Sequence, residues 1–253
     1  MPKRLTEQQV EQYKRDGFVS PVRVISEDDA AKFREKLQEF ETAQGAAIHG
    51  TQKTKCSLLF PWAYELFTSD AVLDAVEDLI GPNILQYQCG VWIKEPESGS
   101  YVSWHQDSTY YGMDPLELVS GWVALSPATA ETGCMQVLPG SHKAGQLPVD
   151  YTEGSDDNLL ASGQATRYPV DESQIALMEL QPGEMSLHHV ALVHSSRPNH
   201  GADRRIGIAG GYLPPHVAQT TDLKASAMLV RGEDNYGHYP LIEQPPRGVD
   251  DTA

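Results

Sequence analysis

The stretch GEMSLHHVALVHSSRPN, residues 183–199, is the most informative part of this chain. Its apolar positions predict a β-strand over residues 185–194 that ends in a polar turn. A second strand is predicted over residues 205–213, and one of its faces carries an arginine and three small residues, Arg205, Gly207, Ala209 and Gly211. Core strands usually fill such a face with Val, Ile or Leu, so the small residues predict a slot for a bound molecule.

The stretch Trp104-His105-Gln106-Asp107 supplies polar side chains that can meet His194. His105 and Asp107 are two residues apart, so on an extended strand their side chains point the same way. Two neutral imidazoles and one carboxylate on one side of a metal form the facial triad of non-haem Fe(II) oxygenases, which leaves positions open for a co-substrate and O₂. Arg205 follows His194 by eleven residues and is expected to pair with a carboxylate of that co-substrate.

The sequence periodicity changes near residue 83. Helices are predicted upstream, over residues 7–16, 27–42, 63–67 and 69–80, with a polar loop over 44–56. Strands are predicted downstream, over residues 84–94, 102–106, 117–125, 134–138, 175–180, 185–194 and 205–213. We therefore expect a mainly β protein with N-terminal helices, a double-stranded β-helix (jelly-roll, cupin-like) core over about 83–231 and a helical buttress over about 1–80, all in a single domain over 1–253. The polar, acidic residues 143–173 are predicted to form part of a lid.

The net charge and the cysteine content limit the classes of partner and the cellular location that we expect. The chain has 19 basic and 35 acidic residues in 253, a net charge of −16. Such a surface repels nucleic acid and anionic membranes, so neither is an expected partner. The three cysteines form no Cys-x-x-Cys pattern, and no apolar run approaches the roughly 18 residues of a membrane span. We expect a cytoplasmic protein that acts on a small molecule; the sequence leaves the oligomeric state open.

Several short motifs resemble one family when they are taken together and in order. They are Asp16-Gly17-Phe18, Gly81-Pro82-Asn83-Ile84, Trp104-His105-Gln106-Asp107, Gly121-Trp122, Thr132-Gly133-Cys134-Met135, Pro139-Gly140-Ser141-His142-Lys143 and the segment from His189 through Asn199 to Arg205. The chain resembles the phytanoyl-CoA dioxygenase family of Fe(II)- and 2-oxoglutarate-dependent oxygenases. The motifs span nearly the whole chain, and as a set they are specific.

The resemblance implies a role for each matching residue. His105, Asp107 and His194 would bind Fe(II), and Arg205 would hold the distal carboxylate of 2-oxoglutarate. Residues near the co-substrate would be Gln106, Trp122 and Ser196. The catalytic set is then His105, Asp107, His194 and Arg205, with O₂ as the oxidant. Related halogenases carry Gly or Ala where this chain has Asp107, so the carboxylate favours hydroxylation or another oxidation of an unactivated C–H bond.

Other residues have open assignments. Strand alternation favours His188 as the neighbour of His194, whereas the family register favours His189, and either could be structural. Residues that could contact the substrate are Tyr110, Tyr111, Lys53 and Lys55. Lys94 ends a predicted strand and is interpreted as solvated surface, together with the two loop lysines.

The expected function is oxidation of a small-molecule metabolite, with succinate and CO₂ as co-products. The family name suggests an acyl-CoA, but the chain has no basic cluster to receive the CoA phosphates. Two alternatives use the same residues: a non-catalytic sensor domain that binds metal and 2-oxoglutarate, and a cupin-like metal hydrolase. The hydrolase gives no reason for Arg205 and the face of small residues.

Overall fold

The computed structural model describes residues 1–151, 156–160, 165–223 and 225–243. Its first helix, α1 (Glu7–Asp16), begins after Thr6, whose side chain accepts a hydrogen bond from the Gln9 backbone. It ends at Gly17, which takes a left-handed conformation that glycine adopts without strain. Both ends lie where the sequence predicted them. No helix among the described residues is long and apolar enough to cross a membrane.

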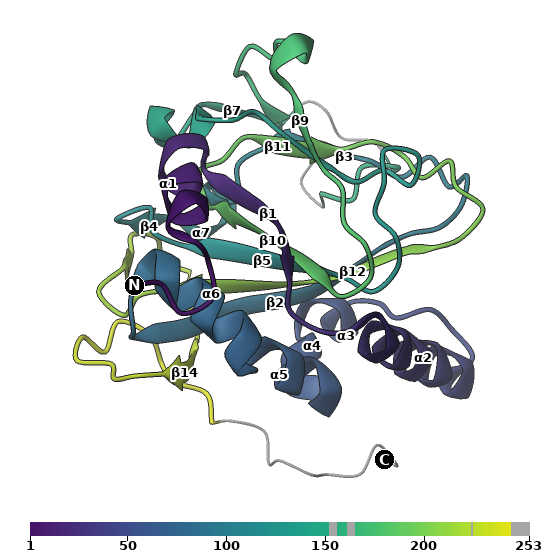
Figure 1. Ribbon diagram of the computed structural model, residues 1–253, viewed down its shortest axis with the longest axis horizontal. Helices are drawn as coiled ribbons and strands as arrows, with labels where there is room; N and C mark the ends of the chain where they lie inside the picture. The colour runs from purple at the N-terminus through teal and green to yellow at the C-terminus, as the bar shows by residue number, and fades with distance from the viewer. Residues whose placement is uncertain (152–155, 161–164, 224, 244–253) are drawn as a thin grey trace.

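The next helices along the chain lie on one side of a sheet (Figure 1). The predicted helices are present as α2 (Glu27–Gln44), α5 (Pro61–Phe67) and α6 (Asp70–Ile80). The polar loop predicted over 44–56 is wrong in part, because it contains α3 (Thr51–Thr54) and the first residue of α4 (Cys56–Leu59). These turns are too short to show a helical period, and burial of Cys56 and Ser57 holds the second of them in place.

Two antiparallel sheets form the core, and the larger has the strand order β1-β10-β5-β12-β2-β14. Its strands are β1 (Phe18–Arg23), β10 (Glu184–His189), β5 (Val119–Ala124), β12 (Arg205–Leu213), β2 (Ile84–Lys94) and β14 (Met228–Arg231). The smaller sheet contains β3 (Val102–His105), β11 (His194–Ser196), β6 (Met135–Val137) and β9 (Ala176–Met178). Figure 1 shows α2, α5 and α6 on one side of the larger sheet and the smaller sheet on the other. This is the predicted jelly roll with helical buttresses.

Short elements connect these strands. They are α7 (Ser108–Tyr111), β4 (Met113–Asp114), η1 (Ser141–Ala144), β7 (Val149–Asp150), β8 (Ala165–Thr166), η2 (Glu172–Gln174) and β13 (Ala218–Gln219). The lid predicted over 143–173 includes β7, β8 and η2, but its residues 152–155 and 161–164 lie outside the described residues.

The single strand predicted over 185–194 is wrong, because the chain changes sheets within it. β10 ends at His189 in the larger sheet and β11 begins at His194 in the smaller sheet. Between them the Leu192 backbone donates to the His189 carbonyl at 2.8 Å, which closes a turn. Residues 190–193 are fully buried in this crossover, so their apolar character does not distinguish a strand from a buried turn.

The small residues of β12 make room for side chains of the protein itself. A Cβ atom on Gly207 would lie 1.7 Å from Cζ2 of Trp122, and one on Gly211 would lie 2.9 Å from Cγ of Gln88. Glycine at these two positions is therefore a packing requirement. The slot predicted on this face is partly filled, and the open part lies beside Ala209 and Arg205.

Candidate active site

Three potential metal ligands meet between the two sheets. His105 ends β3 and His194 begins β11, and the two residues are direct partners across the smaller sheet. Their Nε2 atoms lie 3.4 Å and 3.7 Å from Oδ1 of Asp107. All three ligand atoms lie within 4.8 Å of one another, a spacing that a single metal ion can bridge.

Asp107 reaches this point by a route that the sequence did not predict. β3 ends at His105, and Asp107 has helical backbone angles, φ −61° and ψ −33°, at the start of α7. The Ser108 backbone donates to the Val190 carbonyl at 3.0 Å and fixes the turn. The side chains of His105 and Asp107 do converge as predicted, but strand alternation is not the cause. A helical turn brings the Asp107 carboxylate back towards His105.

In both histidines, one ring nitrogen lies within hydrogen-bond distance of a backbone carbonyl oxygen. Nδ1 of His105 lies 2.9 Å from the Ser103 oxygen, and Nδ1 of His194 lies 2.9 Å from the Leu192 oxygen. A carbonyl only accepts, so Nδ1 carries the proton and Nε2 keeps a free lone pair. Burial, with His105 beside it, lowers the pKa of His194 to about 3. The donor set thus fits a divalent transition metal without prior loss of a proton from His194.

The second oxygen of Asp107 is held by two other side chains. Ser120 donates its hydroxyl to Oδ2 at 2.9 Å, and Nε2 of His188 lies 3.4 Å from the same atom. Burial by itself raises the pKa of Asp107, but the nearby histidines, with His194 foremost, bring that pKa well below its usual value. The carboxylate is therefore ionised, and its Oδ1 faces the two metal-binding imidazoles.

The structure distinguishes the two adjacent histidines on β10. His188 lines the cavity between the sheets and contacts Asp107. His189 instead accepts a hydrogen bond at Nδ1 from the Ala191 backbone, at 3.1 Å. His188 is thus the residue beside the ligand set, as strand alternation suggested.

Arg205 lies buried at the other end of the cavity. Its Cζ atom is 5.2 Å from the centre of the Trp122 ring, and its Nε atom has no hydrogen-bond partner among the described residues. Burial lowers its pKa to about 10, so it carries a charge at neutral pH. Arg204 faces the opposite way and pairs with Glu41 and Glu95, at 2.7 Å and 2.9 Å.

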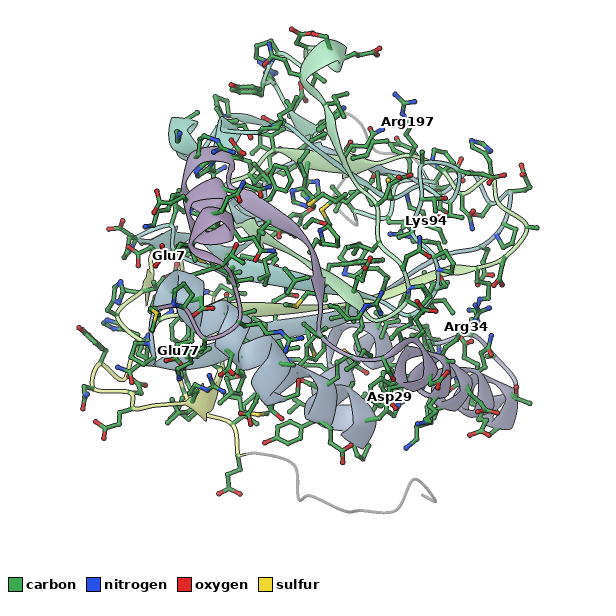
Figure 2. The ribbon with its side chains drawn as sticks, in the orientation of Figure 1. Glu7, Asp29, Arg34, Glu77, Lys94 and Arg197 are labelled. Atoms are coloured by element: carbon green, nitrogen blue, oxygen red, sulfur yellow. The ribbon has the colours of Figure 1, made fainter. Side chains whose placement is uncertain are left out.

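Lys94 is a second buried basic residue, and it lies beside Arg205 in the larger sheet. Its interpretation as solvated surface is wrong, because its side chain is fully buried (Figure 2). Nζ donates to the Ser196 hydroxyl at 2.7 Å and also to the Arg197 carbonyl. Burial, followed by the charge of its β-sheet partner Arg205, lowers the pKa of Lys94 to about 6. An anion bound here would favour the charged form of Lys94 and so oppose the effects of burial and of Arg205 on its pKa.

The cavity between these ends has a volume of about 70 Å³. Its walls combine the polar residues above with the apolar or aromatic side chains of Trp92, Val102, Tyr111, Trp122 and Met135. One end therefore presents a metal-binding set, the other presents the buried Arg205, and a largely apolar space joins them. Such a site suits an anionic co-substrate that reaches from the metal to the arginine.

Comparison with known proteins agrees with this geometry. The phytanoyl-CoA dioxygenase family model matches residues 13–207. This chain belongs to the phytanoyl-CoA dioxygenase family. It is 28% identical over 185 residues, or 73% of its length, to a probable alpha-ketoglutarate-dependent hypophosphite dioxygenase of Stutzerimonas stutzeri. It is 33% identical over 144 residues, or 53% of its length, to human peroxisomal phytanoyl-CoA dioxygenase.

These alignments span 61% and 42% of the two relatives, so the chain covers less than two thirds of either. A solved structure of the non-heme monooxygenase ThoJ superposes more completely. It has a TM-score of 0.82 and 32% identity, with 94% of this chain and 88% of ThoJ covered. The likeness therefore extends over both the helical buttress and the jelly roll.

The structure brings some of the predicted site residues of this family member to the cavity and not others. Tyr111, Trp122 and Ser196 line the cavity with the triad and Arg205. The residues placed outside it are Gln106, Tyr110, Lys53 and Lys55. Tyr110 still lies beside the ring of His105, with 6.4 Å between ring centres. Lys53 belongs to α3, and Lys55 borders a different pocket.

Gln106 has its amide fully engaged elsewhere. Nε2 donates to the carbonyls of Ala191 and Gly145, at 2.7 Å and 2.9 Å, and Oε1 accepts from the Leu147 backbone at 2.8 Å. Gln106 follows the last residue of β3 and is not among the residues that line the cavity. Its side chain anchors the segment after η1, and its contact with the co-substrate stays a prediction.

Proposed function

We propose that the protein is an Fe(II)- and 2-oxoglutarate-dependent dioxygenase that hydroxylates an unactivated C–H bond of a small molecule. The observation that carries this proposal is the pairing of two features in one cavity. A His-Asp-His set occupies one end, and an arginine whose Nε has no hydrogen-bond partner in the described part of the chain occupies the other. Bound iron would supply the coupled reduction of O₂ and oxidative decarboxylation of 2-oxoglutarate, with succinate and CO₂ as co-products.

The residues of the chain would bind and orient the reactants. His105, Asp107 and His194 would hold iron on one side through two nitrogens and one oxygen. Arg205 would grip the distal carboxylate with its planar guanidinium. Lys94 already donates to Oγ of Ser196, so the Ser196 hydroxyl hydrogen is free to donate to the same carboxylate.

The reaction outcome is argued from Asp107. A carboxylate ligand occupies the position that a halide would need, which favours transfer of oxygen over transfer of halogen. Ser120 and His188 hold its Oδ2 atom, so Oδ1 is the oxygen available to the metal. This arrangement keeps the carboxylate in one orientation while the other metal positions exchange ligands.

The substrate is proposed to be a small organic molecule without a CoA group. Arg205 is the single Lys or Arg among the described residues that line the cavity, and it is assigned to 2-oxoglutarate. The apolar wall of Trp92, Val102 and Met135 suits a hydrocarbon surface. The names of the two relatives refer to hypophosphite and to phytanoyl-CoA, so neither substrate is transferred to this chain.

A metabolite-library screen tests the proposal. Purified protein with Fe(II), O₂ and 2-oxoglutarate should release succinate faster when a substrate is present, and the product should gain one oxygen atom. Binding of 2-oxoglutarate without stimulated succinate release by any compound would favour the sensor alternative. Turnover that needs metal but not 2-oxoglutarate would favour the hydrolase.

A further inference from the structure

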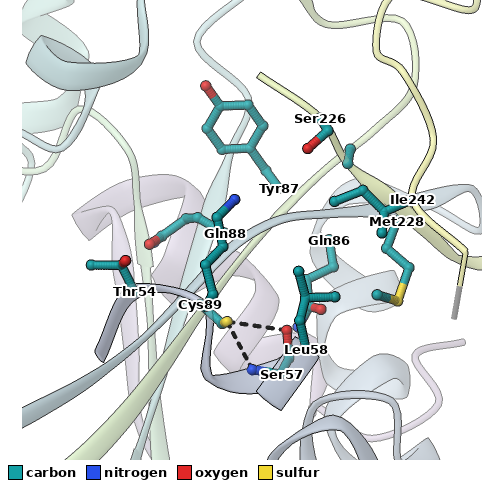
Figure 3. A pocket seen from close by; sticks show the side chains of 12 residues that line it. Thr54, Ser57, Leu58, Gln86, Tyr87, Gln88, Cys89, Ser226, Met228 and Ile242 are labelled. Atoms are coloured by element: carbon teal, nitrogen blue, oxygen red, sulfur yellow. Dashed lines mark hydrogen bonds between the residues drawn. The ribbon is translucent and has the colours of Figure 1, made fainter. Parts of the chain in front are cut away.

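A second pocket lies outside the metal cavity, between α3, α4, β2 and the segment that includes β14 (Figure 3). Its volume is about 60 Å³, and its lining includes Lys55, Ser57, Gln88, Cys89 and Met228. The Cys89 sulfur accepts hydrogen bonds from the Ser57 backbone at 3.1 Å and from the Ser57 hydroxyl at 3.0 Å. Two donors on one sulfur favour its thiolate form.

Cys56 adjoins a donor to the same sulfur. It begins α4, immediately before Ser57, whose backbone N–H donates to Cys89, and both cysteines are buried in one core cluster. The neighbouring Cys56 thiol, the Ser57 donors and the charge of Lys55 lower the pKa of Cys89, although burial opposes them. The neighbouring Cys89, together with burial, raises the pKa of Cys56. The pair therefore contains one activated thiol and one protonated thiol beside it.

We propose that Cys89 and Cys56 form a peroxide-reactive dithiol site, in which Cys89 attacks and Cys56 resolves. The Cys89 thiolate attacks one oxygen of hydrogen peroxide, the O–O bond breaks, and hydroxide leaves with the electron pair. The product is a sulfenic acid on Cys89. Cys56 then attacks that sulfur, a disulfide forms, and water leaves. Overall, two thiols and one peroxide give one disulfide and two waters.

One residue borders both pockets. Gln88 lines the metal cavity and also the pocket that Cys89 lines. Under the proposed function, the oxygen-using metal centre is a source of partly reduced oxygen in the same molecule. The disulfide would join α4 to β2, the strand that carries Gln88.

The third cysteine provides an internal control. Cys134 is also buried, and its burial raises its pKa to about 11. With Ni(II) in place of iron, so that the metal does not decompose peroxide, the full chain is treated with hydrogen peroxide and mapped by mass spectrometry. We expect Cys89 to react at least tenfold faster than Cys134 in the same molecule, with loss of two hydrogens and a bridged peptide that joins Cys56 to Cys89.

Variants separate the two roles. Cys56→Ser should accumulate a sulfenic acid on Cys89 that dimedone traps, and Cys134→Ser should form the bridge at the wild-type rate. Cys89→Ser should leave Cys56 reduced. The proposal is overturned if wild-type Cys89 and Cys134 react at equal rates, or if the first sulfenic acid forms on Cys56. The wild-type comparison requires no substitution, so it decides the matter even if a variant fails to fold.

Discussion

The two ends of the cavity differ in whether the protein itself supplies partners for a buried charge. At the metal end, both oxygens of Asp107 lie close to surrounding side chains, with His105 and His194 near Oδ1 and with His188 and Ser120 near Oδ2. At the other end, no carboxylate in the described part of the chain forms an ion pair with the buried Arg205 or Lys94. The charge of the buried Arg205 without a counter-ion costs several kcal/mol, which favours binding of an anion from solution.

The largest effect is expected at the metal end. His194→Ala removes a nitrogen whose ring is already oriented by the Leu192 carbonyl, so Fe(II) or Co(II) affinity should fall by at least about 100-fold and turnover should vanish. Calorimetric metal titration measures the first quantity. His189→Ala is a matched control, because His189 contacts the Ala191 backbone and the rings of Tyr13 and His142 rather than the triad. Full activity in His194→Ala would mean that His188 is the ligand.

Arg205→Lys tests the cation end. The lysine keeps the charge but loses the planar fork, so the apparent KM for 2-oxoglutarate should rise at least tenfold, or about 1.4 kcal/mol. Arg204→Lys is the neighbouring control, since that residue faces away from the cavity and pairs with Glu41 and Glu95. Steady-state kinetics with varied 2-oxoglutarate distinguish the two variants. A large effect in Arg204→Lys and none in Arg205→Lys would refute the assignment.

Lys94→Met should separate binding from stability. Loss of the ammonium beside Ser196 should raise the KM for 2-oxoglutarate about three- to tenfold. The folded protein should nevertheless become more stable by about 1–3 kcal/mol at pH 7, because an apolar side chain of similar length replaces a buried amine that loses its proton on folding. Urea unfolding measures the second effect. An unstable variant with unchanged KM would show that Lys94 serves the fold alone.

The same residue predicts a pH dependence. The pKa of Lys94 is about 6 in the folded protein and about 10.4 in an unfolded chain. Between these values the unfolded chain binds more protons, so the contribution of Lys94 makes the free energy of unfolding increase with pH. Lys94→Met should reduce the change in unfolding free energy between pH 7 and pH 9 by about 1–3 kcal/mol. Identical pH slopes in the two proteins would contradict the low pKa.

The two ends also differ in how far the sequence predicts them. The triad was predicted from the sequence around it and from the family motifs, because a His-x-Asp pair alone is common, and Arg205 was chosen over Arg204 because strand alternation separates them. Lys94 was misinterpreted because it precedes Glu95 and Pro96 in the sequence, a context typical of exposed chain. Its burial depends on residues about a hundred positions later, where Asn199 donates to the Lys94 carbonyl at 3.0 Å and Ser196 accepts from Nζ. No local pattern records those contacts.

The elements of the fold also divide into those that local sequence predicts and those that depend on distant contacts. The bounds of β2 and β12 match the predicted strands over 84–94 and 205–213, because each is one long run with clear turn residues at its ends. The change of sheet after His189 and the helical turn at Asp107 were missed. Both depend on how one sheet closes over the other, which periodicity along a single strand does not encode. The division of the chain into one domain stays a prediction.

The smallest effect is expected at Gln106, which the family resemblance places near the co-substrate and the structure places under the segment after η1. Gln106→Ala would leave the Ala191 and Gly145 carbonyls and the Leu147 N–H without their partner, at a cost of about 1–3 kcal/mol. Limited proteolysis between residues 143 and 151 should accelerate, while the KM for 2-oxoglutarate stays within about twofold of the wild-type value. Gln146→Ala is the matched control, because Gln146 contacts Oε1 of Gln106 from the exposed side at 3.3 Å. Protection of this segment should increase when 2-oxoglutarate and substrate bind together, as expected of part of a lid. A tenfold rise in KM with unchanged proteolysis would instead assign Gln106 to the co-substrate.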